Sequence, residues 1–247
     1  MVFVSIITPA TGNPLLKQAV ESVQKQDYEF LEHFIVIDGQ PREAQVLEVL
    51  AGLSFRKQAS LMCLPYPTGT GRYNGHRIYG AAGFLVRGDY LICLDEDNWL
   101  EPEHVSSLVR SVGERGLEWG YALRNIVDPA GRFVIKDDCE SLGKWPSYLD
   151  DSDFHIDVNC YFLRKNVAIS IAPLWYRRAK EPGVQSVDRA ICGHLLEYFP
   201  HFQTTGRYTV NYRTGSTEQS VQPEFFIRGN QVMQERYPQG FPWLQAE

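Results

Sequence analysis

The sequence has no long apolar run, and this argues against a membrane-spanning helix. A span needs roughly 18 to 20 consecutive apolar residues, and no stretch of this 247-residue chain approaches that length. The opening MVFVSIITPA is apolar but carries no basic leader and is too short for a signal peptide. We therefore expect a cytoplasmic protein without a transmembrane segment, in contact with membranes only as a peripheral protein at the inner face.

A basic surplus and paired cysteines are missing as well. The chain has 24 Lys and Arg against 30 Asp and Glu, a net charge of −6, whereas nucleic-acid-binding proteins usually carry a basic surplus. Its five cysteines are odd in number, and no pair has CxxC spacing. Neither a disulfide framework nor a zinc site is therefore expected. The composition argues against nucleic acid as a partner and favours a reducing compartment.

Short apolar runs alternate with amphipathic stretches over the first hundred residues. Runs rich in β-branched residues predict strands, and apolar residues at three- and four-residue spacing predict helices. The expected strands are 2–8, 33–39, 61–64 and 90–94, and the expected helices are 14–26, 42–50 and 75–86. Alternation of this kind is typical of an α/β, Rossmann-like fold with a mostly parallel central sheet.

The second half of the chain is less regular. The expected strands there are 119–126, 132–135, 158–163 and 208–212, and the expected helices are 102–115, 184–198 and 223–235. We expect one domain over residues 1–200, made of a first half (1–100) and a second half (101–200). Residues 201–247 would then be a C-terminal extension packed on that domain.

The strongest chemical signal is the run of three acids that follows the strand predicted at 90–94. Asp95, Glu96 and Asp97 repel one another there, and a bound cation would relieve that repulsion. Mg²⁺ and Mn²⁺ prefer carboxylate oxygens together with substrate phosphates. Residues two apart on an extended segment face the same way, so Asp95 and Asp97 would address one metal site. The alternative is an acidic entry to the helix at 102–115.

Two further features lie at the end of a strand or in a loop. Asp38 follows the second predicted strand, where its carboxylate can accept hydrogen bonds from a base or ribose, or form a local Asp-Gly turn. The glycine-rich segment PTGTGRYNGHR is not a dinucleotide fingerprint, because the third glycine is missing. Its arginines would reach phosphate oxygens, or the segment is a solvated basic loop.

Taken in order, these motifs resemble those of the family 2 glycosyltransferases. VSIITPA, SVQKQ (22–26), VIDG (36–39), GDY (88–90) and LDEDN (94–98) stand where that family has its conserved strands, helix and DxD motif. The resemblance covers about residues 1–195. It implies a GT-A, nucleotide-diphosphosugar transferase fold, in which residues 1–100 would be the nucleotide-sugar-binding half and residues 101–200 the acceptor half. It also implies a metal-dependent, inverting transfer from a UDP- or GDP-sugar to a glycan, lipid-linked or other hydroxyl acceptor, in glycan or polysaccharide biosynthesis.

The resemblance also implies roles for particular residues. Asp97, with Asp95, would bind the Mn²⁺ or Mg²⁺ that bridges the diphosphate, and Asp38 would face the base. The implied donor pocket consists of Thr8, Pro9, Asp38, Arg72, Asn74, Asp95 and Glu96.

The remaining roles concern proton transfer and a further metal ligand. Asp188 stands where the family has its catalytic carboxylate, and we expect it to be the general base. Asp153 and Asp157 are rival bases, and a helix cap is the alternative role for Asp188. His194 or His201 would supply a further metal ligand, as a C-terminal histidine does in some GT-A enzymes.

Two other functions stay open at this point. A sugar nucleotidyltransferase shares a related fold, but it usually has a glycine-rich signature ending in Arg and Lys, and TPATGNPLLK does not match it. A catalytically inactive nucleotide-sugar-binding module would not be expected to keep Asp38, Asp95, Asp97 and Asp188. The apolar segment near the C-terminus would pack on its own domain or contact a second copy, as in a homodimer.

Overall fold

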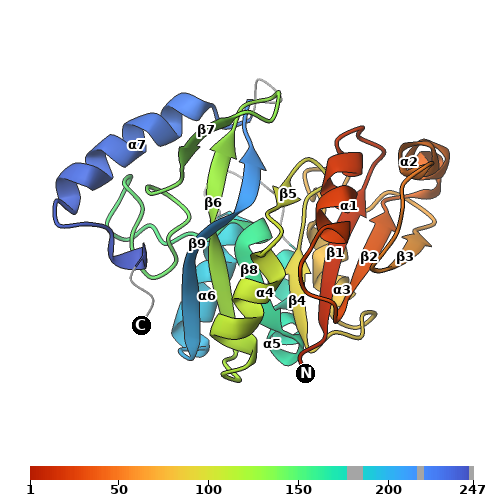
Figure 1. The fold of residues 1–247 in the computed structure, drawn as a ribbon, viewed down its shortest axis with the longest axis horizontal. Coiled ribbons are helices and arrows are strands. Elements are labelled where there is room, and N and C mark those ends of the chain that lie inside the picture. The colour runs from red at the N-terminus through yellow and green to blue at the C-terminus, as the bar shows by residue number, and fades with distance from the viewer. Residues whose placement is uncertain (177–185, 216–219, 245–247) are drawn as a thin grey trace.

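One mixed sheet of nine strands organises the computed structural model, which describes residues 1–176, 186–215 and 220–244 (Figure 1). The strand order is β3-β2-β1-β4-β8-β6-β9-β5, and β7 pairs with β6 outside this path. The strands are β1 (Val4–Ala10), β2 (Leu31–Ile37), β3 (Gln58–Cys63), β4 (Tyr90–Cys93), β5 (Trp99–Leu100), β6 (Trp119–Val127), β7 (Phe133–Lys136), β8 (Tyr161–Arg164) and β9 (Phe202–Arg213).

The first four strands form the parallel part of the sheet. β1 pairs with β2 and β4, and β2 pairs with β3, all in parallel register. Beyond β4 the sheet is mixed, because β8 runs antiparallel to both β4 and β6, while β6 and β9 are parallel. The predicted α/β class with a mostly parallel core is confirmed. Parallel strands bring their carboxyl ends to one edge, where ligands bind in such sheets.

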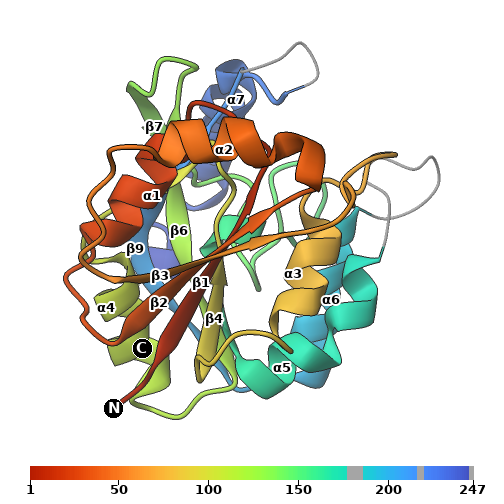
Figure 2. The ribbon, with the colours of Figure 1, turned by 90° about the vertical axis from the view of Figure 1, so that its right-hand side faces the viewer.

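Helices cover both faces of the sheet. Figure 2 shows α1 and α4 on one face, and α3, α5 and α6 on the other. The helices are α1 (Leu16–Gln24), α2 (Glu43–Leu50), α3 (His76–Ala82), α4 (His104–Leu108), α5 (Lys165–Ser170), α6 (Val187–Tyr198) and α7 (Pro223–Arg236). Among the described residues, no helix is both long enough and apolar enough to cross a membrane.

The apolar spacing of α1 explains how that helix packs. Its fully buried positions Leu16, Ala19, Val20 and Val23 lie three or four residues apart and so share one face. Leu16 and Val20 join a small core with residues of β1, β2 and α2. Burial of each such side chain stabilises the fold by about 1.5 to 3 kcal/mol. The predicted helix at 14–26 is therefore anchored on the strands whose ends form the site.

Two predicted elements are irregular in the structure. The helix expected at 102–115 is α4 followed by a π-helical turn (Val109–Gly113), in which the N–H of Glu114 donates to the carbonyl of Val109. The strand expected at 158–163 begins as a 3₁₀ turn (Val158–Cys160), because the Asp157 carboxylate accepts the N–H of Asn159 and turns the chain. Local side-chain bonds of this kind compete with regular structure.

The C-terminal segment is built into the sheet. β9 lies between β6 and β5, so residues 202–213, which we expected in an extension packed on the domain, form an inner strand of its sheet. After it, α7 buries Phe226 and Met233 completely, and the indole N–H of buried Trp243 donates to Asp138 Oδ1 at 2.7 Å. The sequence pattern revealed only the end of β9, because the first half of the strand consists mostly of polar residues and Gly206.

This topology predicts that a chain ending at residue 200 will not fold cooperatively. Such a chain lacks β9, so the backbone groups of β6 and β5 that pair with it would lose their partners. Thermal unfolding followed by circular dichroism, with the full chain as the control, tests this. If the 1–200 chain unfolds cooperatively at a temperature close to that of the full chain, the result would support the domain boundary predicted at residue 200.

Candidate active site

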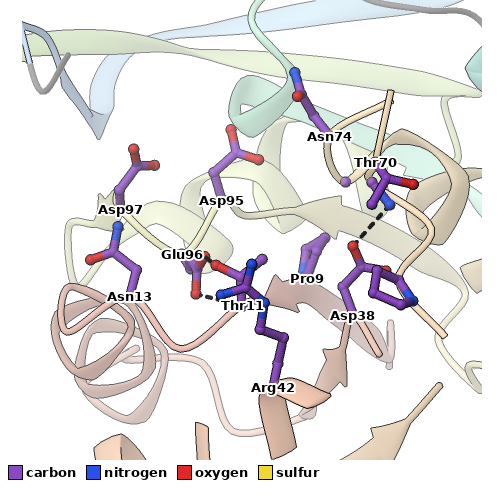
Figure 3. Close-up of a pocket in the computed structure, with 13 residues that line it drawn as sticks. Pro9, Thr11, Asn13, Asp38, Arg42, Thr70, Asn74, Asp95, Glu96 and Asp97 are labelled. Atoms are coloured by element: carbon purple, nitrogen blue, oxygen red, sulfur yellow. Dashed lines mark hydrogen bonds between the residues drawn. The ribbon is translucent and has the colours of Figure 1, made fainter. Parts of the chain in front are cut away.

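The segments that follow β1, β2 and β4 surround a first pocket of about 550 Å³ (Figure 3). A pocket at the carboxyl ends of parallel strands is the usual place for a nucleotide in α/β proteins. The residues that line this pocket are Pro9, Thr11, Asn13, Asp38, Arg42, Pro67, Gly69, Thr70, Asn74, Gly75, Asp95, Glu96 and Asp97. We refer to it as the first pocket.

A second pocket of about 650 Å³ adjoins the first and shares Asn74, Gly75, Asp95 and Asp97 with it. Its other walls come from Asn98, from the end of β9 and from the start of α6, and they include Asp157 and Asp188. The two aspartates after β4 therefore stand at the junction of two cavities. We refer to this cavity as the second pocket.

Asp38 is bound to a neighbouring loop. Its Oδ1 accepts the N–H and the hydroxyl of Thr68 at 2.6 and 2.7 Å, and its Oδ2 accepts the N–H of Gly69 at 2.9 Å. A Cβ at Gly69 would lie 2.5 Å from the carbonyl oxygen of Asn74 and 2.8 Å from Asp38 Oδ2, so this position requires glycine. Asp38 lines the first pocket as expected, and it also holds the glycine-rich loop against it.

Glu96 similarly holds a segment of the opposite wall of the first pocket. Its Oε2 accepts the N–H of Thr11 at 2.9 Å, and its Oε1 accepts the Thr11 hydroxyl. In Figure 3, Asp95 and Asp97 point to the same side while Glu96 turns toward Thr11. The expected orientation is therefore present, but the segment is a turn rather than an extended stretch, because the Asn98 N–H donates to the Asp95 carbonyl at 3.2 Å. Glu96 therefore fixes the segment after β1 that forms part of the first pocket.

The Asp95 carboxylate is held by two donors. The Tyr79 hydroxyl donates to its Oδ1 at 2.7 Å, and the Asn159 amide donates to its Oδ2 at 2.9 Å. Burial, followed by the charges of Asp97 and Asp157, raises the pKa of Asp95 from 3.8 to about 7. The ionised carboxylate is therefore destabilised in this place, and a cation would favour it.

Asp97 is the freer of the two aspartates. Among the described residues, no side chain donates a hydrogen bond to its carboxylate, and burial raises its pKa. Arg213 of β9 opposes that rise, and its Nε donates to the Asp97 backbone carbonyl at 3.1 Å. The side chain is thus partly buried and without a side-chain donor among the described residues, while its backbone is fixed. A divalent cation fits such a group.

No complete metal cage exists within the described residues, because no three His, Cys, Asp or Glu side chains there are grouped to hold an ion. This agrees with a site in which one or two carboxylates act together with substrate phosphates. Neither His194 nor His201 lines either pocket. His194 stacks on Tyr198 of its own helix at 4.6 Å. The structure therefore does not bring the two predicted histidines to Asp95 and Asp97.

Two predicted donor-binding residues also lie outside the first pocket. Thr8 is fully buried, and its hydroxyl is hydrogen-bonded to His33 Nε2 at 2.9 Å. Successive side chains of a strand point to opposite faces, so Pro9 reaches the pocket and Thr8 does not. Arg72 has a positive φ of 71° and an exposed side chain that lines neither cavity. Asn74, with φ 49°, lines both pockets.

On the far wall of the second pocket, buried Arg124 binds three carboxylates. Its guanidinium donates to Asp137 at 2.7 Å, and to Glu140 and Asp157 at 2.6 Å each. Asp157 Oδ1 meanwhile accepts the backbone and side-chain N–H groups of Asn159 at 2.9 and 2.8 Å. Both oxygens of this rival base are thus already bonded. Asn159 also links Asp157 to Asp95, so the two halves of the site are tied together.

The other rival base, Asp153, is engaged elsewhere. It forms an ion pair with Arg189 at 2.5 Å and accepts the Ser147 hydroxyl at 2.7 Å. Burial raises the pKa of Asp153, but the bonds from Arg189 and Ser147 outweigh it and lower the pKa overall. Asp153 does not line the second pocket. Its position and its bonds are those of a structural carboxylate.

Asp188 has the properties of a base. It lies in the first turn of α6 and lines the second pocket, and its buried Oδ1 has no hydrogen-bond partner in the part of the chain that the structure describes. Burial, then the charges of Asp157 and Asp95, raises its pKa from 3.8 to about 7, against the opposing effect of Arg124. A pKa near the working pH suits proton transfer. A helix-capping role is not what the structure shows, because Asp188 lies inside the helix and Ser186 is at the cap position.

Sequence reasoning missed Tyr79, Arg124, Asn159 and Arg213. Each meets a partner that belongs to another segment of the chain: Tyr79 is 16 residues and Asn159 is 64 residues from Asp95, and Arg213 is 116 residues from Asp97. A single sequence offers no local signal for such pairs. The one available hint was that Asn159 lies two residues after Asp157 at the start of an apolar run.

A fold and a site of this kind define a nucleotide-binding α/β protein, and comparisons with known proteins narrow the class. Residues 5–118 match the family model described as glycosyl transferase family 2. Among curated proteins, nothing matches the chain. The family match places residues 5–118 in glycosyl transferase family 2. It ends well before residue 195, to which the resemblance in the sequence extended.

Solved structures of TarS from S. aureus share the fold. TarS 1-349 has a TM-score of 0.62 and 14% identity, over 85% of this chain and 60% of that chain. Its complex with UDP-GlcNAc has a TM-score of 0.62 and 14% identity, over 95% and 65%. Its complex with UDP has a TM-score of 0.60 and 14% identity, over 100% and 67%. This chain therefore covers less than two thirds of the length of the TarS chain in the first two of these structures.

These comparisons confirm the recognition made from the sequence. The chain has the GT-A fold of the glycosyltransferases, and its N-terminal half belongs to family 2. By family and by fold it is classed with the glycosyltransferases.

The raised pKa of Asp188 predicts a pH-dependent stability in the absence of metal. Because its pKa is about 7 in the folded chain against 3.8 otherwise, ionisation opposes folding. The free energy of unfolding therefore falls as pH rises from about 4 to about 7. Asp188→Asn removes this effect and should raise the free energy of unfolding by about 1 to 3 kcal/mol at pH 8, with no gain near pH 4.

Urea denaturation in the presence of a chelator measures this difference. Asp151→Asn is the matched control, because the Asp151 side chain is 89% exposed. An Asp188→Asn effect that is the same at pH 4 and pH 8 would show that the group is not destabilised by ionisation.

Proposed function

We propose that this chain is a metal-dependent, inverting glycosyltransferase acting in glycan or polysaccharide biosynthesis. It would move a sugar from a UDP- or GDP-sugar to a hydroxyl of a glycan, lipid-linked or other acceptor. The observation that carries the proposal is the meeting of two pockets at Asp95 and Asp97, with a base-like carboxylate, Asp188, in the second. Peripheral membrane association and a homodimer stay predictions.

The first pocket suits the nucleotide part of the donor. Its walls are the segments fixed by Asp38 and Glu96, so they are arranged before a ligand arrives, which lowers the cost of ordering them on binding. The sugar would then extend past Asp95 to the junction with the second pocket. TarS, of the same fold, has been solved with UDP and with UDP-GlcNAc, and this supports a nucleotide-sugar donor.

Asp97, with Asp95 beside it, would hold the divalent metal. When bound, Mn²⁺ or Mg²⁺ neutralises the charge that develops on the leaving diphosphate. The fit rests on the Asp97 carboxylate, which is partly buried and free of side-chain donors among the described residues. Asp95 would stay oriented by Tyr79 and Asn159, so its direction does not depend on the ligand.

Asp188 would take the proton of the acceptor hydroxyl as that oxygen attacks the anomeric carbon. One displacement from the face opposite the leaving group inverts the anomeric centre. The buried Oδ1 without a partner leaves the carboxylate available to a hydroxyl. The ties of Asp157 to Arg124 and Asn159, and of Asp153 to Arg189, hold the neighbouring carboxylates still.

A sugar nucleotidyltransferase and an inactive binding module fit the site less well. Asp188 would have no role in pyrophosphate exchange on the nucleotide side of the junction. An inactive module would gain stability by losing carboxylates that oppose folding when ionised, yet the buried acids at the junction are present together.

Metal-dependent nucleotide binding is the first prediction of this proposal. UDP, GDP, CMP and dTDP are compared by thermal shift, each with and without Mn²⁺. A ligand at about 100 times its dissociation constant adds about 2.7 kcal/mol to the free energy of unfolding. We expect one nucleoside diphosphate to stabilise the chain only with Mn²⁺, and Asp97→Ala to abolish that shift.

Asp151→Ala serves as the control, because its carboxylate is exposed and outside both pockets. Stabilisation of the Asp97→Ala chain equal to that of the unaltered chain would rule out the metal assignment. The absence of any shift with all four nucleotides would favour an inactive module.

Loss of the base should separate binding from transfer. Asp188→Asn is expected to bind the nucleotide diphosphate normally while its transfer rate falls by about 10²-fold or more. In the unaltered chain, transfer should rise as pH increases through about 7 and then level off, because only the ionised carboxylate accepts a proton. Turnover by Asp188→Asn equal to that of the unaltered chain would return the role to Asp157 or Asp153.

A further inference from the structure

The second pocket carries more negative than positive charge. The carboxylates of Asp95, Asp97, Glu140, Asp157 and Asp188 line it, against the guanidinium groups of Arg124, Arg189 and Arg213. His155 also lines it, but burial lowers the pKa of His155, so the ring contributes no positive charge at neutral pH. The excess of negative charge belongs to the wall of this pocket, because these side chains all surround the same cavity.

The arginines do not offset this excess, because two of them are bound to further carboxylates behind the wall. Arg124 binds Asp137 in addition to Glu140 and Asp157, and Arg189 binds Asp153 in addition to Glu140. Among the described residues, four carboxylates (Asp137, Glu140, Asp153 and Asp157) therefore share two guanidinium groups on this wall, before the aspartates with a raised pKa are counted. In a partly buried site such an excess is weakly screened by water.

The donor and its metal do not remove the excess. A divalent cation and the diphosphate it neutralises bring opposite charges of similar size to the junction at Asp97. The negative charge of Glu140 and Asp157, on the far side of the second pocket, is left facing the acceptor. Asp188 Oδ1, buried and without a partner among the described residues, would receive the proton of the acceptor hydroxyl, so a positive group on the acceptor would face Glu140 and Asp157.

We infer that the acceptor is a hydroxyl compound that carries a protonated amino group, such as an amino sugar, and that anionic acceptors are disfavoured. This inference rests on the proposed function, and it adds the chemical class of the acceptor. Discrimination would come as much from repulsion of a wrong charge as from attraction of the right one. Hydroxyl groups alone would find donors and acceptors in the pocket, but they would leave its charge uncompensated.

Three matched sugars test the inference: 6-amino-6-deoxyglucose, glucose and glucuronic acid differ only in the group at C6. Each is titrated by saturation-transfer NMR into the full chain with UDP and Mn²⁺. We expect the amino sugar to bind at least about tenfold more tightly than glucuronate, with glucose between them. Because the effect is electrostatic, this ratio should shrink between about 20 mM and about 500 mM NaCl.

Glu140→Gln should lower the ratio of amino sugar to glucuronate affinity several-fold, because it removes one carboxylate from the pocket wall. Glu114→Gln is the matched control: Glu114 is exposed and lines neither pocket, so the ratio should not change. The salt dependence needs no variant and decides the matter if Glu140→Gln does not fold. Glucuronate binding as tightly as the amino sugar, or no discrimination among the three while UDP still binds, would overturn the inference. Failure of UDP to bind would instead contradict the proposed function.

Discussion

The buried guanidinium of Arg124 is the contact on which the acceptor side of the molecule depends. It projects from β6 and joins Asp137 and Glu140, which follow β7, to Asp157, which precedes β8. Its planar group also lies over the Tyr212 ring at 4.4 Å. Breaking a buried ion pair by removing one partner typically costs about 3 to 5 kcal/mol. Residues 137–157 form no helix or strand of their own, and these ion pairs fix the segment to β6.

The same network places the reacting groups relative to each other. Asn159 bonds Asp157 on one side and Asp95 on the other, so the position set by Arg124 is passed to Asp95. Asp188 is left without a bond at Oδ1 and with a raised pKa. The site thus combines rigid supports with a few carboxylates that oppose folding when ionised. Stability lost in this way is common at functional sites.

The sequence allowed the donor side to be predicted better than the acceptor side, for a physical reason. Asp38, Asp95 and Asp97 directly follow apolar strands, so strand pattern alone places them at one edge of the sheet. Thr8 was expected in the donor pocket but is buried in the core, whereas its neighbour Pro9 lines the pocket. A shift of one residue along a strand moves a side chain to the opposite face of the sheet. Arg124 and Asn159 could not be predicted, because their partners come from other elements and no periodicity records such pairings. The inner position of β9 was missed for the same reason.

That inner position of β9 also orders the assembly of the protein. β1 to β4 and the segments that line the first pocket can come together once residues up to 97 have emerged from the ribosome. β6 can pair with β7 and β8, but its other edge and β5 must wait for β9, whose pairing with β5 joins residues more than 100 positions apart, as Trp99 and Asn211 show. Contacts of such long range form slowly. On the ribosome, the wall that would bind the nucleotide is therefore complete well before the wall that would receive the acceptor, and the growing chain exposes an unpaired edge of β6 in the interval.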